Sequence, residues 1–566
     1  MAEATKRRMP VLQGILPIDR SYLGPAIAAG ITLAALGIPE TMGYATIAGM
    51  PVVTGLYTIL IPIAVFAVLG SSRHLVVGAD SATAAIMAAG LIGLAATGST
   101  DYVSLAGILA ILTAAILLLA RLFRLGFLAD FLSRSVLIGF LTGVGIQVAM
   151  GQVAAMFGVP GGADGGTVQK FFETLSQIPS QANTTTVLVS VGVLATILIC
   201  KKINKKIPGG LIAVIGAIAV SYWADLASDG VATVGKVQSG LPAFHVPSYG
   251  WNEWTTLLAT AASIFIVILA QSAATSRAYA AKYSEQFSEN VDLVGLSFAN
   301  LSAGLFGTFV VNGSPTKSQM VDDAGGRSQL SMLVTAVIVL IVLLWLTAPI
   351  AYMPEAVLAS IVFLIGIELV DVKGMKRIWS WRRDEFWVAT VTAIVVVAVG
   401  VKQGVILAMI LSILDHLRRS YRPHNTYLVR RADGTMQSDP VDPEKGPAMI
   451  VPGLVIYRFG AIMYYANAEK LIDDVRTVES AEATRPEWLC LDAELVTDVD
   501  FSAGATILDA LRLIQGAGTR LVFTRVKSEV REQLDRYGVT EIVGTDAYFD
   551  SIEAVLEAFG ARSQAS

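Results

Sequence analysis

Two carboxylates and one amine lie within or beside long apolar stretches of the sequence, at Glu40, Asp80 and Lys317. Ionisable side chains in apolar spans are costly, so they usually bind a ligand, carry a proton or form an ion pair. Burial favours the neutral form of a carboxylate, and Glu40 directly follows Pro39, where a helix loses a hydrogen bond. Glu40 is therefore a candidate proton-coupling group. The alternative is a structural hydrogen bond that seals the proline kink.

Lys317 lies near the expected start of a short helix. An ammonium group at this end opposes the helix dipole, so it needs a negative partner. A substrate anion could supply that charge. An ion pair with Asp80, Asp322 or Asp323 could supply it as well, and both interpretations stay open. Asp80 is itself either a second coupling carboxylate or a helix N-cap.

Two segments far apart in the sequence share one pattern, residues 74–81 (HLVVGADS) and 308–315 (TFVVNGSP). Each has a short β-branched stretch, then a glycine, then small hydroxyl residues that can begin a helix. A helix start carries unpaired N–H groups and partial positive charge, and two facing starts form an anion site. Hydroxyl groups that could add donors belong to Ser81, Thr83, Ser314 and Thr316. The alternative is two kinked spans with small packing residues.

The composition is that of a membrane protein, with 54% hydrophobic and 15% charged residues and a mean hydropathy of +0.63. Apolar runs of about 18 residues or more indicate membrane-spanning helices. We predict about fourteen transmembrane segments, in residues 24–46, 51–70, 80–97, 102–122, 126–157, 184–201, 208–226, 255–280, 288–308, 313–323, 329–349, 353–370, 384–400 and 402–418. The third and tenth are too short to cross as ordinary helices. The polar, glycine-rich connection 158–183 is expected to be a loop.

Lysine and arginine residues fall mainly on one side of the membrane when the N-terminus is placed in the cytoplasm. The opposite side holds little more than Lys170, Lys236 and Lys402. This asymmetry predicts a multi-pass protein of the cell (inner or plasma) membrane with both termini in the cytoplasm. Fourteen spans divide into two halves with an odd number each, so the halves must have opposite orientations, as in an inverted repeat.

The character of the sequence changes after about residue 420 because charge rises and long apolar runs stop. We predict a transmembrane domain at 1–420, a linker at 421–448 with a small hairpin around Asp433-Gly434, and a cytoplasmic domain at 449–562. In that domain the predicted strands are Leu454–Arg458, Trp488–Asp492 and Arg520–Phe523, and the predicted helices are Asn467–Thr477, Ala503–Gln515, Glu529–Arg536 and Ile552–Ala558. Such alternation indicates an α/β sheet.

Three stretches of the chain resemble the SulP family of anion transporters, the sulfate permease-like proteins. They are Pro39–Ala45 with Gly55–Tyr57, Gly70–Ala82, and Gly313–Leu330. The C-terminal part resembles a STAS domain, the usual partner in this family. The resemblance covers almost the whole chain. It implies an α-helical polytopic fold of seven plus seven spans as an inverted repeat, with a core domain moving against a gate domain in an elevator-like way, and a homodimer.

The resemblance also implies an anion held between the N-termini of helices 3 and 10, with contributions from helices 1 and 8. The substrate-binding residues that it implies are Tyr44, Asp80, Ser81, Thr275, Ser314, Thr316 and Lys317, and the coupling candidates are Glu40, Asp80 and Gln271. The family often has glutamine at Glu40, a carboxylate at Gln271, arginine at Lys317 and proline at Ala79. The exchange of Glu and Gln leads to the hypothesis that the ionisable role has moved from helix 8 to Glu40.

The segment Asp498–Ala503 resembles the STAS loop in which related bacterial regulators carry a phosphorylatable serine. Ser502 holds that position here. The alternative, which we favour, is that Ser502 caps the following helix. Asp500 is a second regulatory candidate, for nucleotide or partner binding.

Several functional classes have no support in the sequence. The four histidines show no metal-ligand spacing, and the two cysteines, Cys200 and Cys490, cannot make a disulfide framework or a metal cluster. No G-x-x-x-x-G-K-[ST] phosphate loop occurs. We therefore predict no enzyme activity, no cofactor, no metal, no nucleic-acid partner and no ATP-driven transport.

The residues and the resemblance together predict a secondary active transporter of a small anion in a lipid bilayer. The candidate anions are sulfate, bicarbonate, chloride and dicarboxylates, and the candidate coupling ions are a proton or sodium. One alternative is a nucleobase-type cation symporter of the same fold, against which Lys317 and the STAS-like domain argue. The other is a non-transporting anion sensor that signals through that domain. The sequence leaves open the anion, the coupling ion and the choice among symport, exchange and uniport.

Overall fold

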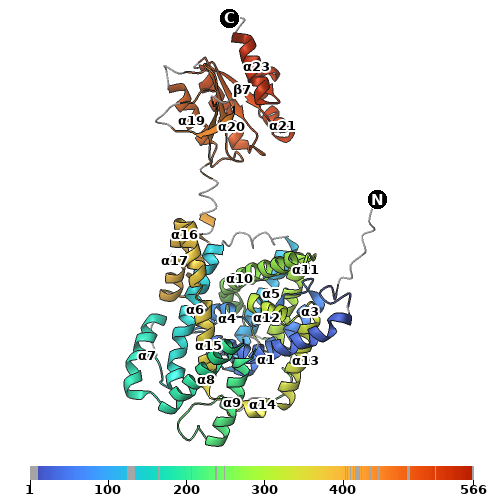
Figure 1. Ribbon diagram of the computed structural model, residues 1–566, viewed down its shortest axis with the longest axis vertical. Helices are drawn as coiled ribbons and strands as arrows, with labels where there is room; N and C mark the ends of the chain where they lie inside the picture. Colours follow the sequence, from blue (N-terminus) through green and yellow to red (C-terminus); the bar gives the residue numbers. More distant parts are fainter. Residues whose placement is uncertain are drawn as a thin grey trace. The chain divides into compact units, whose positions relative to one another are not determined.

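A computed structural model describes residues 11–18, 20–123, 134–162, 166–204, 207–235, 239–247, 249–401, 403–404, 406–407, 410–411, 413–414, 421, 423–431, 435–442, 447–480, 485–516 and 518–563. The chain forms two compact units, residues 1–412 and 413–566. The first is built of helices, and the second is a sheet with helices against it (Figure 1).

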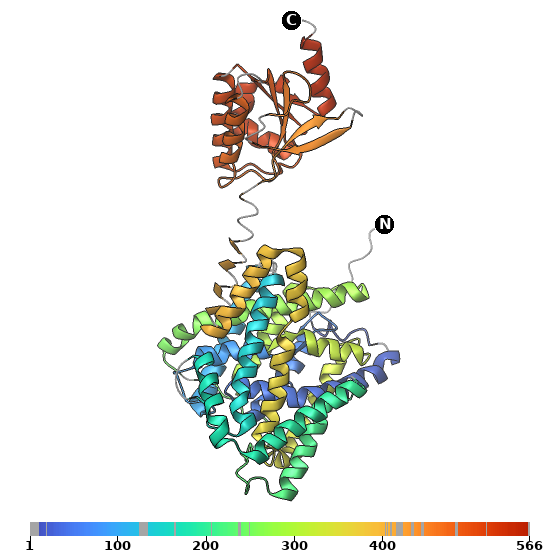
Figure 2. The same ribbon diagram turned by 60° about the vertical axis from the view of Figure 1, so that its left-hand side comes forward.

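The first unit is a helix bundle with one small sheet. In its described residues the helices are η1 (Arg20–Tyr22), α1 (Leu23–Ile47), α2 (Val52–Thr58), α3 (Ile61–Leu69), α4 (Ser81–Leu91), α5 (Thr100–Leu122), α6 (Arg134–Phe157), α7 (Thr167–Gln181), α8 (Thr184–Ile203), α9 (Gly209–Ala224), α10 (Trp251–Tyr283), α11 (Glu289–Leu305), α12 (Pro315–Asp323), α13 (Leu330–Trp345), α14 (Thr347–Ile350), α15 (Glu355–Leu369), α16 (Val372–Trp381) and α17 (Arg383–Ala398). Figure 2 shows helices of the first half of the unit, in blue to teal, beside helices of the second half, in green to gold.

Six helices in the described residues are long and apolar enough to cross a membrane: Arg20–Ile47, Val52–Leu69, Thr100–Leu122, Arg134–Phe157, Thr184–Ile203 and Trp251–Tyr283. Three shorter helices, α4, α9 and α13, are also apolar. Their outer surfaces expose large aliphatic side chains, such as those of Leu188, Val191, Ile215 and Val337. Exposed aliphatic side chains of this kind suit contact with lipid. The predicted helical membrane fold is therefore confirmed, while the prediction for 402–418 lies partly outside the described residues.

Close helix packing in this unit depends on small residues. A Cβ atom at Gly139 in α6 would lie 2.2 Å from the carbonyl oxygen of Ala389 in α17, which is closer than a carbon can approach. Small residues let membrane helices pack at such distances. In lipid the hydrophobic effect does not drive helices together, so association depends on this close packing. The glycine is thus needed to hold α6 against α17.

One sequence prediction is wrong in this unit. The connection 158–183 was expected to be a loop, but Thr167–Gln181 forms the helix α7. The helix is amphipathic, and it buries Thr174, whose hydroxyl donates to the carbonyl of Lys170. A search for long apolar runs does not detect a helix whose apolar residues occupy one face only. The same reason explains why α16 was not predicted.

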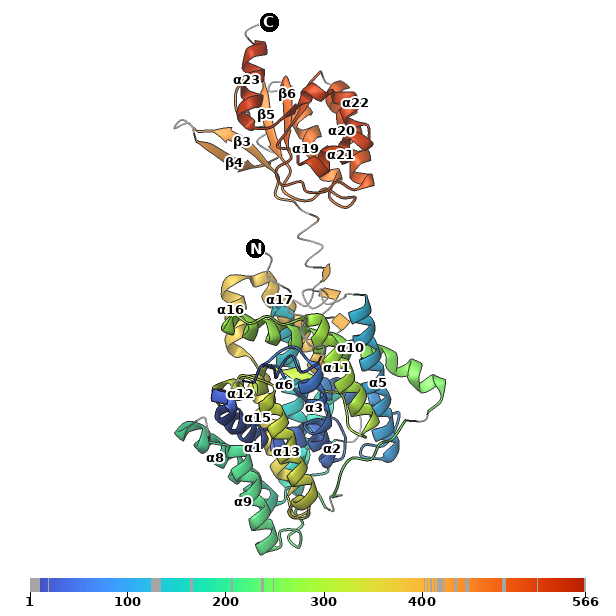
Figure 3. The same ribbon diagram turned by 90° about the vertical axis from the view of Figure 1, so that its right-hand side faces the viewer.

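The second unit is an α/β domain. Its strands are β3 (Thr426–Arg430), β4 (Met436–Pro440), β5 (Leu454–Arg458), β6 (Trp488–Asp492), β7 (Arg520–Thr524) and β8 (Tyr548–Phe549), and its helices are α19 (Glu469–Ser480), α20 (Phe501–Gly516), α21 (Ser528–Arg536), α22 (Val539–Val543), η4 (Thr545–Ala547) and α23 (Ile552–Ser563). The strand order is β4-β3-β5-β6-β7-β8, parallel from β5 to β8 and antiparallel at β3 and β4. Figure 3 shows α23 on one side of the sheet and α20, α21 and α22 on the other.

The alternation of side chains along the strands explains the two layers. In β5, Val455 and Tyr457 pack toward α19 and α20, while Leu454 and Ile456 pack toward α23. Both faces are buried because successive residues of a strand point to opposite sides. The predicted strands and helices are all present with small changes of boundary. The sheet also includes β3 and β4, which lie inside the region predicted as linker, and the turn at Asp433-Gly434 lies outside the described residues.

Candidate functional site

A two-stranded sheet in the first unit joins the two halves of the sequence. The strand β1 (Val76–Gly78) pairs antiparallel with β2 (Asn312–Ser314), so that Val76 lies opposite Ser314 and Gly78 opposite Asn312. A Cβ atom at Gly313 would lie 2.6 Å from the Ser272 hydroxyl oxygen, so a larger residue would require the surrounding side chains to shift. Each strand leads directly into a short helix. The two repeated sequence segments therefore meet in space as the pattern predicted.

Both helix starts are capped by residues of the predicted site. The Asp80 carboxylate accepts a hydrogen bond from Ala82 N–H at 3.1 Å at the start of α4. The Ser314 hydroxyl caps α12 by accepting from Lys317 N–H at 3.4 Å, and Pro315 takes the first helical position. Asp80 thus has the capping role that was one of its two interpretations. Ser81 lies in the first turn of α4 and is 2% exposed.

The Lys317 side chain crosses the space between the two helix starts. It is fully buried, and its Nζ atom donates to the carbonyl oxygen of Ala79 at 3.0 Å. The same atom lies 3.4 Å from Glu40 Oε1 and 4.5 Å from the centre of the Tyr44 ring. Lys317 is therefore ion-paired, but with Glu40 rather than with the aspartates that the sequence offered.

The other predicted partners of Lys317 have different roles. Asp322 accepts from Lys282 at 2.6 Å, from the Tyr283 hydroxyl at 2.5 Å and from Arg327 at 2.5 Å. Asp323 is exposed. The sequence did not show the pairing, because it does not give the distances from Lys317 to Glu40 and to Asp80, which both lie in the other half of the chain.

Glu40 is only partly satisfied in this arrangement. The Tyr44 hydroxyl donates to Glu40 Oε1, the same oxygen that faces Lys317. The second oxygen, Oε2, is buried and has no hydrogen-bond partner among the described residues. An unpaired oxygen of a buried carboxylate costs free energy while it carries charge.

The helix α10 closes another side of the site with uncharged polar groups. The side-chain oxygen Oε1 of Gln271 accepts from the Asn312 amide at 2.5 Å, and the Ser272 hydroxyl donates to Asn312 Oδ1 at 3.2 Å. Thr275 is buried and donates to its own helix at the carbonyl of Gln271, at 2.7 Å. Asn312 was not among the predicted site residues. Its position at the end of a buried β-branched stretch was the available signal.

The predicted substrate residues are thus largely brought together. Tyr44, Asp80, Ser314 and Lys317 lie around the two helix starts, with Glu40 among them. Thr316 is exposed, and its hydroxyl lies 3.1 Å from that of Ser314. This group combines one ammonium, two helix N-termini and several hydroxyls with two carboxylates. Such donors can hold an anion if a carboxylate gives up its charge.

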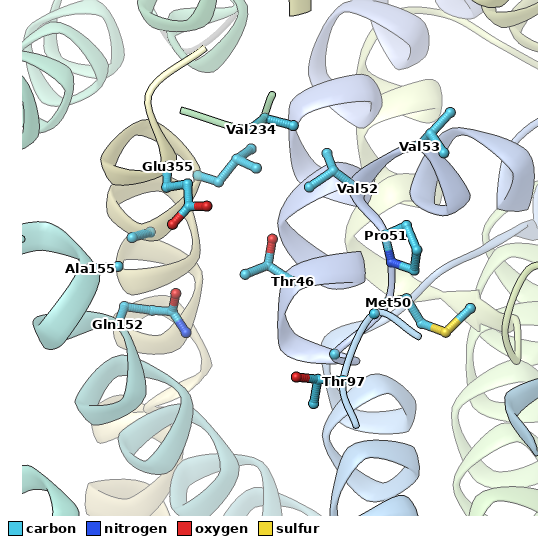
Figure 4. A pocket seen from close by; sticks show the side chains of 14 residues that line it. Thr46, Met50, Pro51, Val52, Val53, Thr97, Gln152, Ala155, Val234 and Glu355 are labelled. Atoms are coloured by element: carbon cyan, nitrogen blue, oxygen red, sulfur yellow. The ribbon is translucent and has the colours of Figure 1, made fainter. Parts of the chain in front are cut away.

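A cavity of about 630 Å³ lies farther along α1, past the helix starts. Figure 4 shows Glu355 and Gln152 on one wall, facing Thr46 and Val52 on the other. Thr46 is six residues after Glu40, which is about 9 Å along a helix axis. Glu355 is the one charged residue among the fourteen that line the cavity.

The two regulatory candidates of the second unit differ in their surroundings. Asp500 forms hydrogen bonds at the start of α20, whereas Ser502 is exposed. Asp500 caps α20, because its carboxylate accepts from Ala503 N–H at 2.7 Å and from Tyr465 N–H at 2.9 Å. Ser502 lies within the first turn of α20 and is exposed. The prediction that Ser502 caps this helix is therefore wrong. In the same domain, burial raises the pKa of the Cys490 thiol, as expected for an unreactive core cysteine.

Replacing Asp500 with alanine is expected to loosen the start of α20 and the Tyr465 loop. An N-cap is worth about 1 kcal/mol, so amide hydrogen exchange at this helix start in the full chain should rise about five-fold. Ser502→Ala is the matched control and should leave the exchange unchanged. Equal effects of the two substitutions would contradict the assignment of the cap.

Comparisons with known proteins match both units. The family model described as the sulfate permease family matches residues 24–392, and the STAS domain model matches residues 447–555. A probable sulfate transporter of Mycobacterium tuberculosis is 34% identical over 547 residues, covering 96% of each chain. The chloroplastic sulfate transporter 4.1 of Arabidopsis thaliana is 27% identical, covering 95% of this chain and 80% of that one.

Solved structures share the fold at lower identity. The murine Solute Carrier 26 family member A9 anion transporter, in the inward-facing state, matches with a TM-score of 0.87 at 21% identity, covering 99% of this chain and 96% of that one. The transmembrane domain of a cyanobacterium bicarbonate transporter matches with a TM-score of 0.60 at 21% identity, covering 70% of this chain and 98% of that one.

Proposed function

This chain belongs to the sulfate permease family, and on that premise we propose that it is a secondary active transporter whose substrate anion binds between the starts of α4 and α12. It is a multi-pass membrane anion transporter with a C-terminal STAS domain. Sulfate is the first candidate substrate because the similar proteins of Mycobacterium and Arabidopsis are named sulfate transporters. Bicarbonate, chloride and dicarboxylates are the other candidates.

The observation that carries this proposal is the position of Lys317. Its ammonium comes from the first turn of α12 and reaches the carbonyl of Ala79, directly before the cap of α4. The Lys317 ammonium therefore lies close to the starts of both α12 and α4. An anion at this point gains the ammonium and the partial positive charges of two helix N-termini.

Charge balance supports Glu40 as the coupling group. With Glu40 ionised, Lys317 is already neutralised by a partly buried carboxylate 3.4 Å away. A second negative charge at the same ammonium is unfavourable in a medium of low polarity. An anion therefore displaces the charge of Glu40, which takes up a proton and keeps its contact with the Tyr44 hydroxyl. Proton and anion then cross together. Gln271 cannot take this role because its amide does not titrate, and Asp80 is engaged as a cap.

The remaining parts of the proposal follow from the resemblance and the charge distribution. The core part, with α1, α4, α10 and α12, moves against the rest of the unit, and two copies assemble as a dimer. Both termini and the STAS domain face the cytoplasm, which follows the basic residues. The STAS domain, with Asp500 and Ser502 at its α20 start, is a regulatory module.

Uptake of labelled sulfate into proteoliposomes tests this function. A carrier gives saturable uptake that a proton gradient drives and that the other candidate anions compete for. Binding without flux would favour the sensor, and competition by nucleobases alone would favour the nucleobase symporter. Large unitary currents would indicate a channel. Each of these three outcomes would contradict the proposal.

The cavity at Glu355 leads to a separate expectation about substrate access. If the anion reaches the site through this cavity, the Glu355 carboxylate repels it, and a dianion more strongly than a monoanion. Two unit charges about 4 Å apart in water interact by about 1 kcal/mol. Glu355→Gln should therefore raise kcat/KM for sulfate about five-fold or more at low salt, and less at high salt. Glu253→Gln, outside the cavity lining, is the control. An unchanged kcat/KM would place the access path elsewhere.

A further inference from the structure

The helix α16 carries a basic face that the anion site does not use. Lys373, Lys376 and Arg377 are exposed, while Gly374 and Ile378 are buried. At 3.6 residues per turn the three basic residues fall within one arc of about 100°, beside the arc that holds the two buried residues. No ion pair is recorded for these three side chains in the part of the chain that the structure describes. The basic face is therefore available to an anionic partner outside this unit.

Exposed tryptophans border the basic face. Trp379 and Trp381 on α16 and Trp387 on α17 are 43%, 76% and 58% exposed. The Trp379 ring lies 4.8 Å from that of Phe386 and 6.5 Å from that of Trp387. Tryptophan next to lysine and arginine is the composition of a segment that lies in a membrane interface. Such rings exposed to water alone would be unfavourable.

The nearby carboxylates do not neutralise this face. Asp371 caps α16 by accepting from Gly374 N–H at 2.7 Å. Asp384 and Glu385 lie 3.9 Å and 3.6 Å from Arg382, and Glu385 also accepts from the Ser135 hydroxyl. These acids are engaged at the helix start and at the start of α17. The Arg377 guanidinium lies 5.9 Å from the centre of the Trp381 ring, and no carboxylate of the described residues lies within ion-pair distance of the three basic side chains.

The place of α16 in the fold suits a lipid surface. It connects α15 to α17, and it lies at one end of the first unit beside α17 (Figure 1). Helix ends at this position meet the headgroup layer when the flanking helices span the bilayer. In the orientation proposed above, this layer is the cytoplasmic one, where anionic lipids attract basic segments.

We propose that α16 binds anionic phospholipid headgroups, with Lys373, Lys376 and Arg377 on the phosphates and Trp379 and Trp381 in the interface. The occupant is the surrounding bilayer, and a basic face with bordering tryptophans is complementary to it in charge and polarity. Each cation near an anionic surface strengthens binding about five-fold. This inference rests on membrane insertion and not on which anion is carried.

Quenching of tryptophan fluorescence by brominated lipid tests the proposal on the full chain in liposomes. Brominated phosphatidylglycerol and brominated phosphatidylcholine, at equal mole fraction, give the relative association constant of the two lipids at the tryptophans. We expect a preference for phosphatidylglycerol that falls more than about five-fold in K373Q/K376Q. The matched control is K201Q/K202Q, which removes two cations from the end of α8. It should keep the preference.

Two further experiments test where the lipid contacts the protein and whether this contact is electrostatic. W379F/W381F should remove most of the excess quenching, because it removes the reporters on α16. Raising the ionic strength from about 0.1 M to about 1 M should reduce the preference, since the Debye length falls from about 10 Å to about 3 Å. Equal quenching by the two lipids in the unchanged protein would overturn the proposal, whether water or another copy covers α16. An effect of K201Q/K202Q as large as that of K373Q/K376Q would overturn it too. Sulfate uptake in the same liposomes reports on transport separately.

Discussion

Replacing Lys317 with glutamine is expected to lower sulfate uptake by about 10- to 150-fold, because a charge-assisted hydrogen bond contributes about 1.5–3 kcal/mol to anion binding. The ammonium is the one side-chain cation that lies between the starts of α4 and α12 in the described residues. Helix N-termini alone attract anions weakly. Initial rates of labelled uptake in proteoliposomes, with binding measured separately by calorimetry, check this result.

The substitution also leaves the partly buried Glu40 without its cation, which is unfavourable while the carboxylate stays charged. Loss of folding could therefore imitate loss of binding. The double variant K317Q/E40Q removes both charges and relieves this cost, so it should recover thermal stability while uptake stays low. K170Q on α7, away from the site, should behave like the unchanged protein. Normal uptake by K317Q/E40Q would refute the role of Lys317 in holding the anion.

Replacing Glu40 with glutamine is expected to remove the pH dependence of transport. If Glu40 carries the coupled proton, as proposed, uptake by the unchanged protein should rise as pH falls. Glutamine resembles the protonated carboxyl group and cannot ionise. E40Q should therefore take up sulfate at a rate that changes little with pH, and a proton gradient should no longer drive accumulation. Uptake and counterflow over a series of pH values measure both effects.

The control for the Glu40 substitution changes a residue of α10, on another side of the site. Adding Gln271→Glu to E40Q places a titratable group on α10, next to Asn312. If the position of the carboxylate in the site matters little, this double variant should recover pH-dependent uptake. A pH profile of E40Q that matches the unchanged protein would eliminate Glu40 as the coupling group and leave Asp80 as the candidate.

The two short helices were predictable because local chemistry specifies them. A β-branched stretch, a glycine and then small hydroxyl residues indicate a strand that ends at a helix start, and this is what β1 with α4 and β2 with α12 show. The α/β order of the second unit was predictable in the same way, from alternating strand and helix patterns. In each case the signal lies within about ten residues of sequence.

Other features depend on contacts between distant parts of the chain. The pairing of Lys317 with Glu40 joins residues from opposite halves, and the sequence had offered Asp80, Asp322 and Asp323 as the partners instead. The N-cap of α20 is a second feature that could not be assigned from the sequence. Asp500 and Ser502 are both good capping residues, and only the backbone shows which of them precedes the helix. Amphipathic helices such as α7 and α16 have no long apolar run that would reveal them.

The most direct test of the central claim is a crystal structure of the protein soaked with selenate, a heavier analogue of sulfate. Anomalous scattering from selenium would locate the anion independently of the protein density. We expect one peak between the starts of α4 and α12, in contact with Lys317 Nζ, with Glu40 moved away from that atom. A selenium peak elsewhere, with Lys317 still bound to Glu40 and to the carbonyl of Ala79, would contradict the account.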